Sequence, residues 1–336
     1  KNRLTPVFAR RVSCSQKEIG YCTLEMQTLQ DVFQSFPSRG DATAFIYRTG
    51  VRRFVFSYAE LHTLSLKMAA LLAQRGVEKG DRVLLWAPNS PSWGVAFWGI
   101  VARGAVVVPV DFLSGREHAE TIARHTEAKL IIESQYKIER IADGKTLLIE
   151  DIEYLLEHIA PAEKVSEVTP QDIAEIVYTS GSTGDPKGVV LTHRNLLANL
   201  IAVNEHIPVI TSEWTFLSLL PLSHMFEQIG GFLTPLYRGA AVVYMRTLKP
   251  SAIMEALAEE SVYAMIIVPR FLQALKNSIE REFAHKHLGK VFAWLLDIAR
   301  SFEKNTRARL FFPVHRKFGK HFRLLVSGGA ALETDV

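Results

Sequence analysis

Apolar positions recur with two different periods along the chain. Short runs of mostly β-branched residues predict buried strands, whereas longer segments with apolar residues three and four apart predict helices. The predicted strands cover residues 82–87, 105–110, 129–133, 173–179, 215–220, 241–244 and 263–268. The predicted helices cover residues 61–75, 116–126, 151–159, 195–205, 226–237 and 251–259.

The alternation of these strands and helices predicts the fold class. Short apolar strands between helices form βαβ units, and such units build a largely parallel sheet that is covered on both faces. The elements fall into two series that divide near residue 190. We therefore expect an α/β protein of two stacked, doubly wound subdomains, residues 1–190 and 191–336. A hairpin around Thr49-Gly50 is predicted ahead of the first series.

One apolar stretch, residues 93–112, has the length of a membrane span. Arg103 interrupts it, and a charged residue near the bilayer centre costs about 2.5–3.5 kcal/mol on insertion scales. Gly104 and Pro109 also divide the stretch into a helix-length piece and a β-branched run. A buried helix followed by a buried strand explains this pattern better, so we expect a soluble protein.

Composition narrows the class further. Of the 336 residues, 48% are hydrophobic and 22% are charged, which is ordinary for a globular protein and excludes a collagen-like or mainly disordered chain. Cys14 and Cys22 are too few for a disulfide framework, so a reducing, cytoplasmic location is expected. The net charge of +4 is too small to indicate nucleic-acid binding.

The basic surplus is concentrated in one segment. Residues 280–323 contain eleven Lys and Arg against four Asp and Glu, within a predicted basic helical insert at about residues 279–321. Apolar residues at helical spacing accompany the charges, among them Phe292, Leu295 and Phe302. Two interpretations stay open: peripheral contact with anionic lipid, at about 1 kcal/mol per charge near the surface, or an ordinary solvated face.

The candidate chemistry lies in a loop that follows the strand at residues 173–179. Residues 179–188 read Thr-Ser-Gly-Ser-Thr-Gly-Asp-Pro-Lys-Gly. Glycines let backbone N–H groups turn toward an anion, hydroxyls add donors, and Lys187 adds a positive charge, so the loop is suited to a polyphosphate. It is not a Walker A loop, because Pro186 stands where the second glycine is needed. It is not a nucleophile elbow either, because Ser180 replaces a required glycine.

The extended motif over residues 178–188, with Leu-Thr-His-Arg-Asn at 191–195, resembles the AMP-binding signature of the adenylate-forming enzymes. That superfamily includes acyl-CoA synthetases, firefly luciferase and the adenylation domains of nonribosomal peptide synthetases. Further blocks of this chain that resemble the family lie at residues 56–61, 80–83, 104–110, 220–227 and 327–332. The resemblance extends from about Leu29 to the end of the sequence.

The resemblance implies a role for each matching residue. It implies ATP binding by Thr179, Ser180, Gly181, Ser182, Thr183, Gly184 and Lys187, and by Gly328, Gly329 and Ala330 beside the adenine. It implies acid binding by His224, Met225, Phe226 and Gly329, with His224 as a gate to the acyl tunnel. Thr179, Lys187 and His224 are the implied catalytic residues, and Thr179 is the implied Mg²⁺ ligand.

The implied activity is that of an AMP-forming acid–thiol ligase. Such an enzyme uses ATP to convert a carboxylic acid to an acyl-adenylate and then transfers the acyl group to coenzyme A. Val-Pro-Arg at 268–270, followed by about 56 residues before Ser327, resembles the long-chain fatty acid branch. Two alternatives remain: another acid, such as an aryl acid or a carrier-protein-bound acid, and a non-catalytic nucleotide- or acyl-binding fragment.

The family pattern continues beyond the motif at residues 327–332. A Thr-Glu motif for Mg²⁺, a ribose-binding Asp, a hinge and a small domain with the adenylation lysine should follow it. We therefore expect this chain to be most of a large N-terminal domain, incomplete at its C-terminal end and with the C-terminal domain absent. A homo-oligomer is compatible with the sequence.

Overall fold

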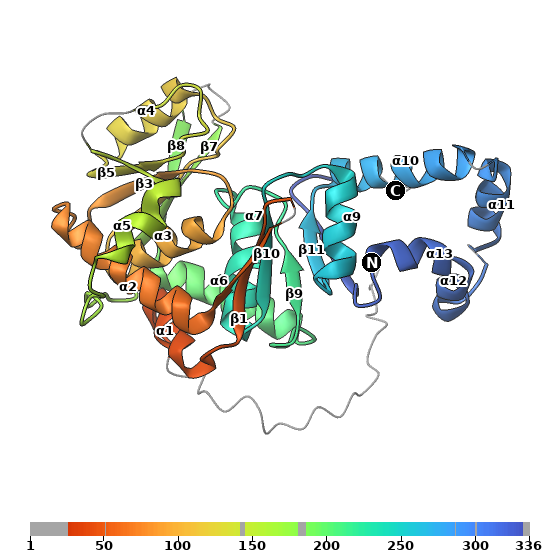
Figure 1. The fold of residues 1–336 in the computed structure, drawn as a ribbon, viewed down its shortest axis with the longest axis horizontal. Helices are drawn as coiled ribbons and strands as arrows, with labels where there is room; N and C mark the ends of the chain where they lie inside the picture. The colour runs from red at the N-terminus through yellow and green to blue at the C-terminus, as the bar shows by residue number, and fades with distance from the viewer. Residues whose placement is uncertain are drawn as a thin grey trace, which may run out of the picture.

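The computed structural model describes residues 26–50, 52–141, 145–180, 186–285, 287–299 and 301–331. These residues form two six-stranded sheets (Figure 1). Sheet 1 has the order β6-β5-β3-β4-β7-β8, and sheet 2 has the order β12-β11-β9-β10-β1-β2. Neighbouring strands run parallel, except that β8 and β2 pair antiparallel at one edge of their sheets. The predicted α/β class with two largely parallel sheets is confirmed.

The strands are short, as the sequence predicts for buried parallel sheets. Sheet 1 contains β3 (Arg82–Trp86), β4 (Val106–Pro109), β5 (Leu130–Glu133), β6 (Thr146–Leu148), β7 (Ile173–Ser180) and β8 (Pro186–Thr192). Sheet 2 contains β1 (Thr43–Arg48), β2 (Arg53–Ser57), β9 (Thr215–Leu217), β10 (Ala241–Met245), β11 (Ala264–Ile267) and β12 (Leu324–Ser327).

The two sheets do not follow the predicted division near residue 190. The hairpin of β1 and β2 belongs to sheet 2, where Phe45 of β1 is in register with Val242 of β10. The ring of Phe45 also packs against Phe232 and Tyr244, with ring centroids 6.2 and 5.3 Å apart. This pairing joins residues distant in sequence, so the local pattern that predicts the hairpin carries no information about its partner.

Helices and helical turns connect the strands. The helices are α1 (Leu29–Gln34), α2 (Tyr58–Gln74), α3 (Pro91–Ala102), α4 (Arg116–His125), α5 (Ile152–Glu157), α6 (His193–His206), α7 (Met225–Glu227), α8 (Thr234–Arg238), α9 (Pro250–Glu259), α10 (Pro269–His285), α11 (Gly289–Ala299), α12 (Lys304–Leu310) and α13 (Phe312–His315). Shorter 3₁₀ turns lie at Phe36–Arg39, Ile149–Asp151 and Arg316–Phe318. Among the described residues, no helix is long and apolar enough to cross a membrane. The stretch at 93–112 covers most of α3 and all of β4, a helix followed by a strand as predicted.

The predicted helix at residues 226–237 is not regular. After α7, residues Gln228–Leu233 form a π-helical turn, and α8 follows. Pro235 has no N–H to donate to the preceding turn, and Gly230 and Gly231 have high backbone freedom, so a regular α-helix is weakened here. The widened turn places Phe232 in the core.

Helix α3 lies in the core between the two sheets. Gly94 faces β1 of sheet 2, and an added Cβ would lie 2.7 Å from the ring of Phe45, which requires a glycine. Trp93 and Phe97 pack edge-to-face on Phe232, with centroids 5.5 and 5.2 Å apart. This aromatic cluster joins the two sheets into one body.

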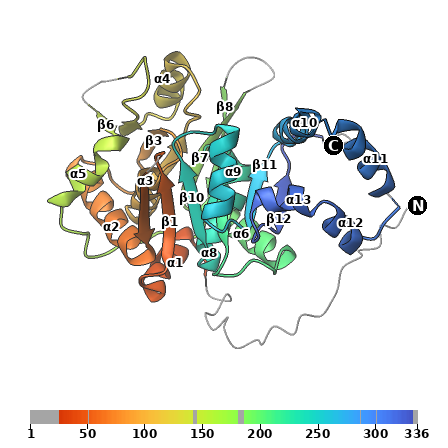
Figure 2. The same ribbon diagram turned by 45° about the vertical axis from the view of Figure 1, so that its right-hand side comes forward.

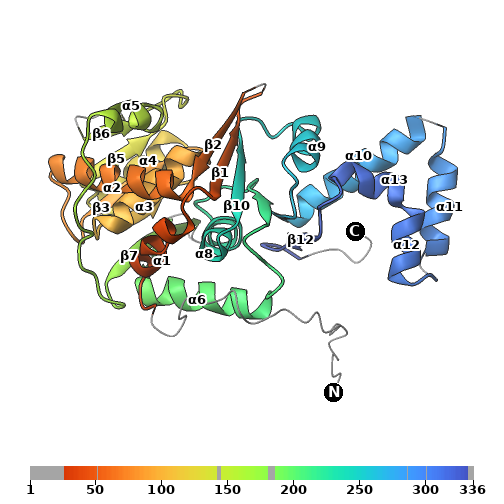
Figure 3. The same cartoon turned by 60° about the horizontal axis from the view of Figure 1, so that its bottom comes forward.

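Helices also cover the outer faces of the sheets. Ala119 and Ile122 of α4 pack against Trp86 and Ile131 of sheet 1. On sheet 2, Ile253 of α9 packs against one face, and Figure 2 shows α9 in front of β10 and β11. Helices α6 and α8 lie on the other side (Figure 3). The sheet faces are thus covered as a doubly wound arrangement requires.

Helices α10–α13 extend from the body as an arm (Figure 1). The helical segment is longer than the predicted insert, because α10 begins at Pro269. Within the arm, Phe292 stacks on Phe283 with centroids 4.3 Å apart and meets Phe311 edge-to-face at 6.0 Å. These rings provide the arm with a small core of its own.

Candidate functional site

The strands β7 and β8 form the hairpin that carries the predicted phosphate loop. Thr179 and Lys187 are cross-strand partners near its tip, and both are exposed. Their side chains can therefore reach one ligand. The predicted residues Gly181, Ser182, Thr183 and Gly184 lie outside the described residues, and the backbone of Ser180 pairs with Pro186. The strand β8 was not predicted, because its first residues were interpreted as loop.

Side chains on β7 alternate between two surroundings. Ile176 and Tyr178 pack toward the core under α4. Glu175, Val177 and Thr179 share the opposite face, where Glu175 is fully buried. Thr179 is thus on the same face of the strand as a buried carboxyl that contacts the second half of the chain.

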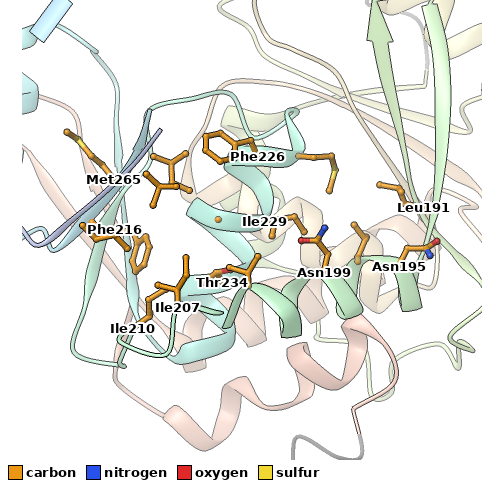
Figure 4. A pocket seen from close by; sticks show the side chains of 18 residues that line it. Leu191, Asn195, Asn199, Ile207, Ile210, Phe216, Phe226, Ile229, Thr234 and Met265 are labelled. Carbon is orange, nitrogen blue, oxygen red and sulfur yellow. The ribbon is translucent and has the colours of Figure 1, made fainter. Parts of the chain in front are cut away.

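A cavity of about 430 Å³ lies between α6, the π-helical turn and sheet 2 (Figure 4). Its lining is largely apolar and consists of Leu191, Asn195, Leu196, Asn199, Val203, Ile207, Ile210, Phe216, Met225, Phe226, Ile229, Gly230, Thr234, Ala264, Met265, Ile266, Leu324 and Val326. Asn195 and Asn199 lie toward the Leu191 end, whereas Phe216 and Ile210 lie at the other end. Met225 and Phe226, two of the four predicted acid-binding residues, thus line an apolar cavity, whereas His224 and Gly329 are not part of its lining.

The predicted glycine segment meets the predicted acid-binding segment at one point. Gly328 follows β12, and a Cβ added to it would lie 2.7 Å from Cζ of Phe226. Gly329 has a φ of +77°, which a residue with a side chain rarely adopts. Gly329 and Ala330 are exposed beside this contact. The structure therefore brings Phe226 together with the loop at 328–330.

His224 pairs with a residue that sequence reasoning missed. Its Nε2 lies 3.6 Å from Oδ2 of Asp111, which follows β4 of sheet 1. The Asp111 carboxylate raises the pKa of His224, and the hydrogen bond with His224 lowers the pKa of Asp111. Asp111 is the first charged residue after a buried parallel strand. That position in the sequence could have identified it as a candidate site residue.

The carboxyls of Glu175 on β7 and of Glu227, three residues after His224, are fully buried. Glu175 accepts a hydrogen bond of 2.6 Å from Nε2 of Gln228, and burial raises its pKa to about 8. Burial likewise raises the pKa of Glu227 to about 8. Both groups are thus mainly protonated at neutral pH. Glu175 could have been identified from the sequence, because it is an acidic residue inside the apolar strand predicted at 173–179.

The described residues offer little to a metal ion on their own. They contain no group of three or more His, Cys, Asp or Glu that could hold one. The exposed hydroxyl of Thr179 is compatible with a single contact to an ion that arrives bound to a nucleotide.

A family model described as AMP-binding enzyme matches residues 32–336. The chain belongs to the AMP-binding enzyme family. It spans about half the length of the curated relatives it matches. The curated relatives that this chain matches are named for different acids.

The relatives of this AMP-binding chain are named for several activities. 4-Coumarate-CoA ligase 2 from Narcissus pseudonarcissus is 29% identical over 283 residues, which cover 76% of this chain and 50% of the relative. Long chain acyl-CoA synthetase 3 from Arabidopsis thaliana is 24% identical over 343 residues, which cover 88% of this chain and 50% of the relative. The N-terminal domain of FACL13 from Mycobacterium tuberculosis has the same fold, with a TM-score of 0.71 and 23% identity over 92% of this chain and 72% of that one.

Proposed function

We propose that this AMP-binding chain takes part in the ATP-dependent activation of a long-chain fatty acid to an acyl-adenylate and then to acyl-CoA. One observation carries the proposal. An apolar cavity is lined by Met225 and Phe226 on one side and by Leu191 on the other. Leu191 lies on β8, the strand that directly follows the predicted phosphate loop. An acid in this cavity would thus have one end toward β8, the strand that also carries Lys187.

The hairpin supplies the nucleotide side of the reaction. Lys187 and Thr179 are cross-strand partners, so the ammonium and the hydroxyl can contact neighbouring phosphate oxygens. A carboxylate oxygen of the acid attacks the α-phosphorus, the bond to pyrophosphate breaks, and Lys187 stabilises the charge on the leaving group. When bound with ATP, Mg²⁺ would offset charge on the same phosphates, with Thr179 as its protein contact.

The cavity supplies the acid side. Its volume of about 430 Å³ falls in the range of small-molecule sites, roughly 300–1,000 Å³. Most of its lining is aliphatic or aromatic, and its exposed amides, Asn195 and Asn199, lie near one end. An acyl chain gains free energy from burial in such a lining at about 0.8 kcal/mol per methylene.

An aryl acid is the second candidate. The relative from Narcissus is named a 4-coumarate-CoA ligase and is 29% identical to this chain. Phe216 and Phe226 in the cavity lining could stack on an aromatic ring. The two candidates differ in one measurable respect: affinity for an aliphatic acid should rise with each methylene, whereas an aryl site selects for ring shape.

Calorimetric titration of the chain with octanoate, dodecanoate, hexadecanoate and 4-coumarate tests the proposal. We expect affinity to rise by about fourfold per methylene until the cavity is filled, with 4-coumarate weaker than dodecanoate. Asn199→Trp should close the exposed side of the cavity and weaken hexadecanoate binding while ATP binding is kept. Ala202→Trp, on the same helix but outside the cavity lining, is the control. Tighter binding of 4-coumarate would favour the second candidate.

Peripheral membrane contact of the arm belongs to the same proposal. Leu288, just before α11, and Val291 and Trp294 on α11 are 44%, 49% and 61% exposed, so the start of this helix presents an apolar strip to solvent. Arg307 and Arg309 on α12 are also exposed. An apolar strip beside basic side chains fits an anionic bilayer surface, where long-chain acids partition.

A further inference from the structure

Three neighbouring strands of sheet 1 each hold the same segment of the second half of the chain. That segment, residues 218–228, connects β9 to the π-helical turn. Asn89 follows β3, Asp111 follows β4, and Glu175 lies on β7, and these strands are adjacent in sheet 1. Each of these three polar side chains contacts a different point of residues 218–228.

Asn89 makes the largest number of these contacts. Its Nδ2 donates to Oγ of Ser218 at 3.0 Å and to the carbonyl oxygen of Leu220 at 2.7 Å. Its Oδ1 accepts from the backbone N–H of Leu222 at 3.0 Å. One side-chain amide thus satisfies two backbone groups in a segment that has no strand or helix partner for them.

Asp111 and Glu175 hold the other end of the segment. Asp111 pairs with His224 at 3.6 Å, and Lys137 is the cation that also acts on the Asp111 carboxylate. Glu175 accepts from Gln228 at 2.6 Å inside the core, where both residues are fully buried. Loss of either partner of the buried bond would leave a polar group unpaired, which is more damaging than loss of an exposed contact.

The held segment forms one wall of the acid cavity. Met225 and Phe226 lie within it, and Ile229 and Gly230 follow directly after it, and all four line the cavity. Between the end of β9 at Leu217 and the start of α7 there is no regular structure. One backbone bond continues the ladder, from the N–H of Ser218 to the carbonyl oxygen of Val243. Beyond Ser218, the position of this wall depends on side-chain hydrogen bonds.

We propose that Asn89, Asp111 and Glu175 are positioning residues that fix residues 218–228 against sheet 1 and thereby set the shape of the acid cavity. This inference rests on the proposed function. Because Glu175 and Thr179 share one face of β7, the same contacts hold the cavity wall in register with the strand that leads to the phosphate loop. The three residues act through the wall and not on the acid itself.

Variants of the three residues separate positioning from general damage. Asn89→Ala removes the donor and the acceptor of the amide, and Glu175→Ala removes the acceptor for Gln228. Asn89→Asp removes only the donor and keeps the size of the side chain. Glu175→Gln is the conservative variant, because an amide can replace a protonated carboxyl opposite Gln228. Glu120→Gln, which removes the exposed ion pair with Arg116, is the matched control.

The measured quantities are the dissociation constants of hexadecanoate and of ATP, determined separately, together with the NMR titration of the His224 ring. We expect Asn89→Ala, Asn89→Asp and Glu175→Ala to weaken hexadecanoate binding by about tenfold and ATP binding by less than about twofold. Glu175→Gln and Glu120→Gln should bind like the wild type. Asp111→Asn should shift the His224 titration to lower pH.

The outcomes distinguish this inference from the proposed function. Wild-type chain that binds ATP but no aliphatic acid would overturn the proposed function, and the inference with it. If a folded Asn89→Asp variant binds hexadecanoate as tightly as the wild type does, the inference is overturned while the proposed function stands. An equal loss of ATP and acid binding, or a Glu175→Gln variant as weak as Glu175→Ala, would also overturn it.

Discussion

The ring of Phe226 occupies the space in front of Gly328, where an added Cβ would lie 2.7 Å from Cζ. This contact joins residues 218–228, which form one wall of the cavity, to the loop after β12. The two segments are distant in sequence. Because the ring leaves no room for a side chain at residue 328, the size of this residue controls where Phe226 lies.

We therefore expect Gly328→Ala to displace Phe226 and to weaken binding of hexadecanoate by about tenfold, since overpacking typically costs about 1–3 kcal/mol. Titration calorimetry measures the effect. Gly115→Ala is the control, because an added Cβ at Gly115 meets nothing within 4 Å. Unchanged acid affinity in folded Gly328→Ala would show that Phe226 does not limit the cavity.

Lys187 should contribute to ATP binding without supporting the fold. Its side chain is exposed at the hairpin tip, so Lys187→Ala removes a charge and little packing. We expect about tenfold weaker ATP binding, because hydrogen bonds to charged groups are worth about 1.5–3 kcal/mol, and an unchanged melting temperature. Lys164→Ala, another exposed lysine in a connecting segment, should bind ATP normally. Equal ATP affinities in the two variants would contradict the phosphate role.

The buried carboxyl of Glu227 predicts a pH dependence of stability. Its pKa is raised to about 8, so the folded state keeps a proton that the unfolded chain releases above its ordinary pKa of 4.5. The free energy of unfolding therefore falls as pH rises from about 5 to 8, by up to about 1.4 kcal/mol per pH unit. Glu227→Gln cannot titrate. Urea unfolding should show this variant gaining stability over the wild type across that range, and a constant difference would refute the assignment.

Gly94 should be intolerant of even one added carbon. A Cβ there would lie 2.7 Å from the ring of Phe45, across the core between the two sheets. We expect Gly94→Ala to lower the free energy of unfolding by about 1–3 kcal/mol. Gly289→Ala, where the added carbon meets Ala284 only at ordinary contact distance of 3.5 Å, should not. Denaturant titration of both variants checks the difference, and equal stabilities would argue against this packing.

The proposed membrane contact predicts two linked signals. Vesicles that contain phosphatidylserine should bind the chain at low salt and shift the fluorescence of Trp294 to shorter wavelength, and both signals should decrease as salt screens the charges. Reversal of Arg307, Arg309 and Arg316 to Glu should abolish binding. The matched control reverses Arg75, Arg194 and Lys249 on the body to Glu and should leave vesicle binding unchanged. If vesicle binding changes neither with salt nor with the arm reversals, the arm has no role in membrane contact. Lys317 is not used because it pairs with Glu282.

Most of the elements could be predicted from local patterns. The strand around Val107 and the helix around Leu71 follow from apolar periodicity alone, and the structure confirms both. The division into sheets could not be predicted, because the partner of Phe45 is Val242 and no local pattern specifies so distant a pairing. The π-helical turn was also missed, since it depends on how Phe232 fits the core.

The candidate site could be predicted from the sequence only where its residues lie within a contiguous motif. Thr179 and Lys187 belong to such a motif, and the structure makes them cross-strand partners. Asn89, Asp111 and Glu175 do not belong to one, because their shared property is contact with residues 218–228 in three dimensions. Polar residues that end or interrupt buried strands would have pointed to them.

Photo-crosslinking locates the bound acyl chain within the fold. A hexadecanoate with a diazirine near its methyl end, irradiated with the chain and mapped by mass spectrometry, should label residues around Ile207, Ile210 and Met265. Unlabelled hexadecanoate and the Asn199→Trp substitution should suppress that labelling, whereas Ala202→Trp should not. Labelling confined to the arm, or labelling of the cavity that Asn199→Trp leaves unchanged, would contradict an acyl site in this cavity.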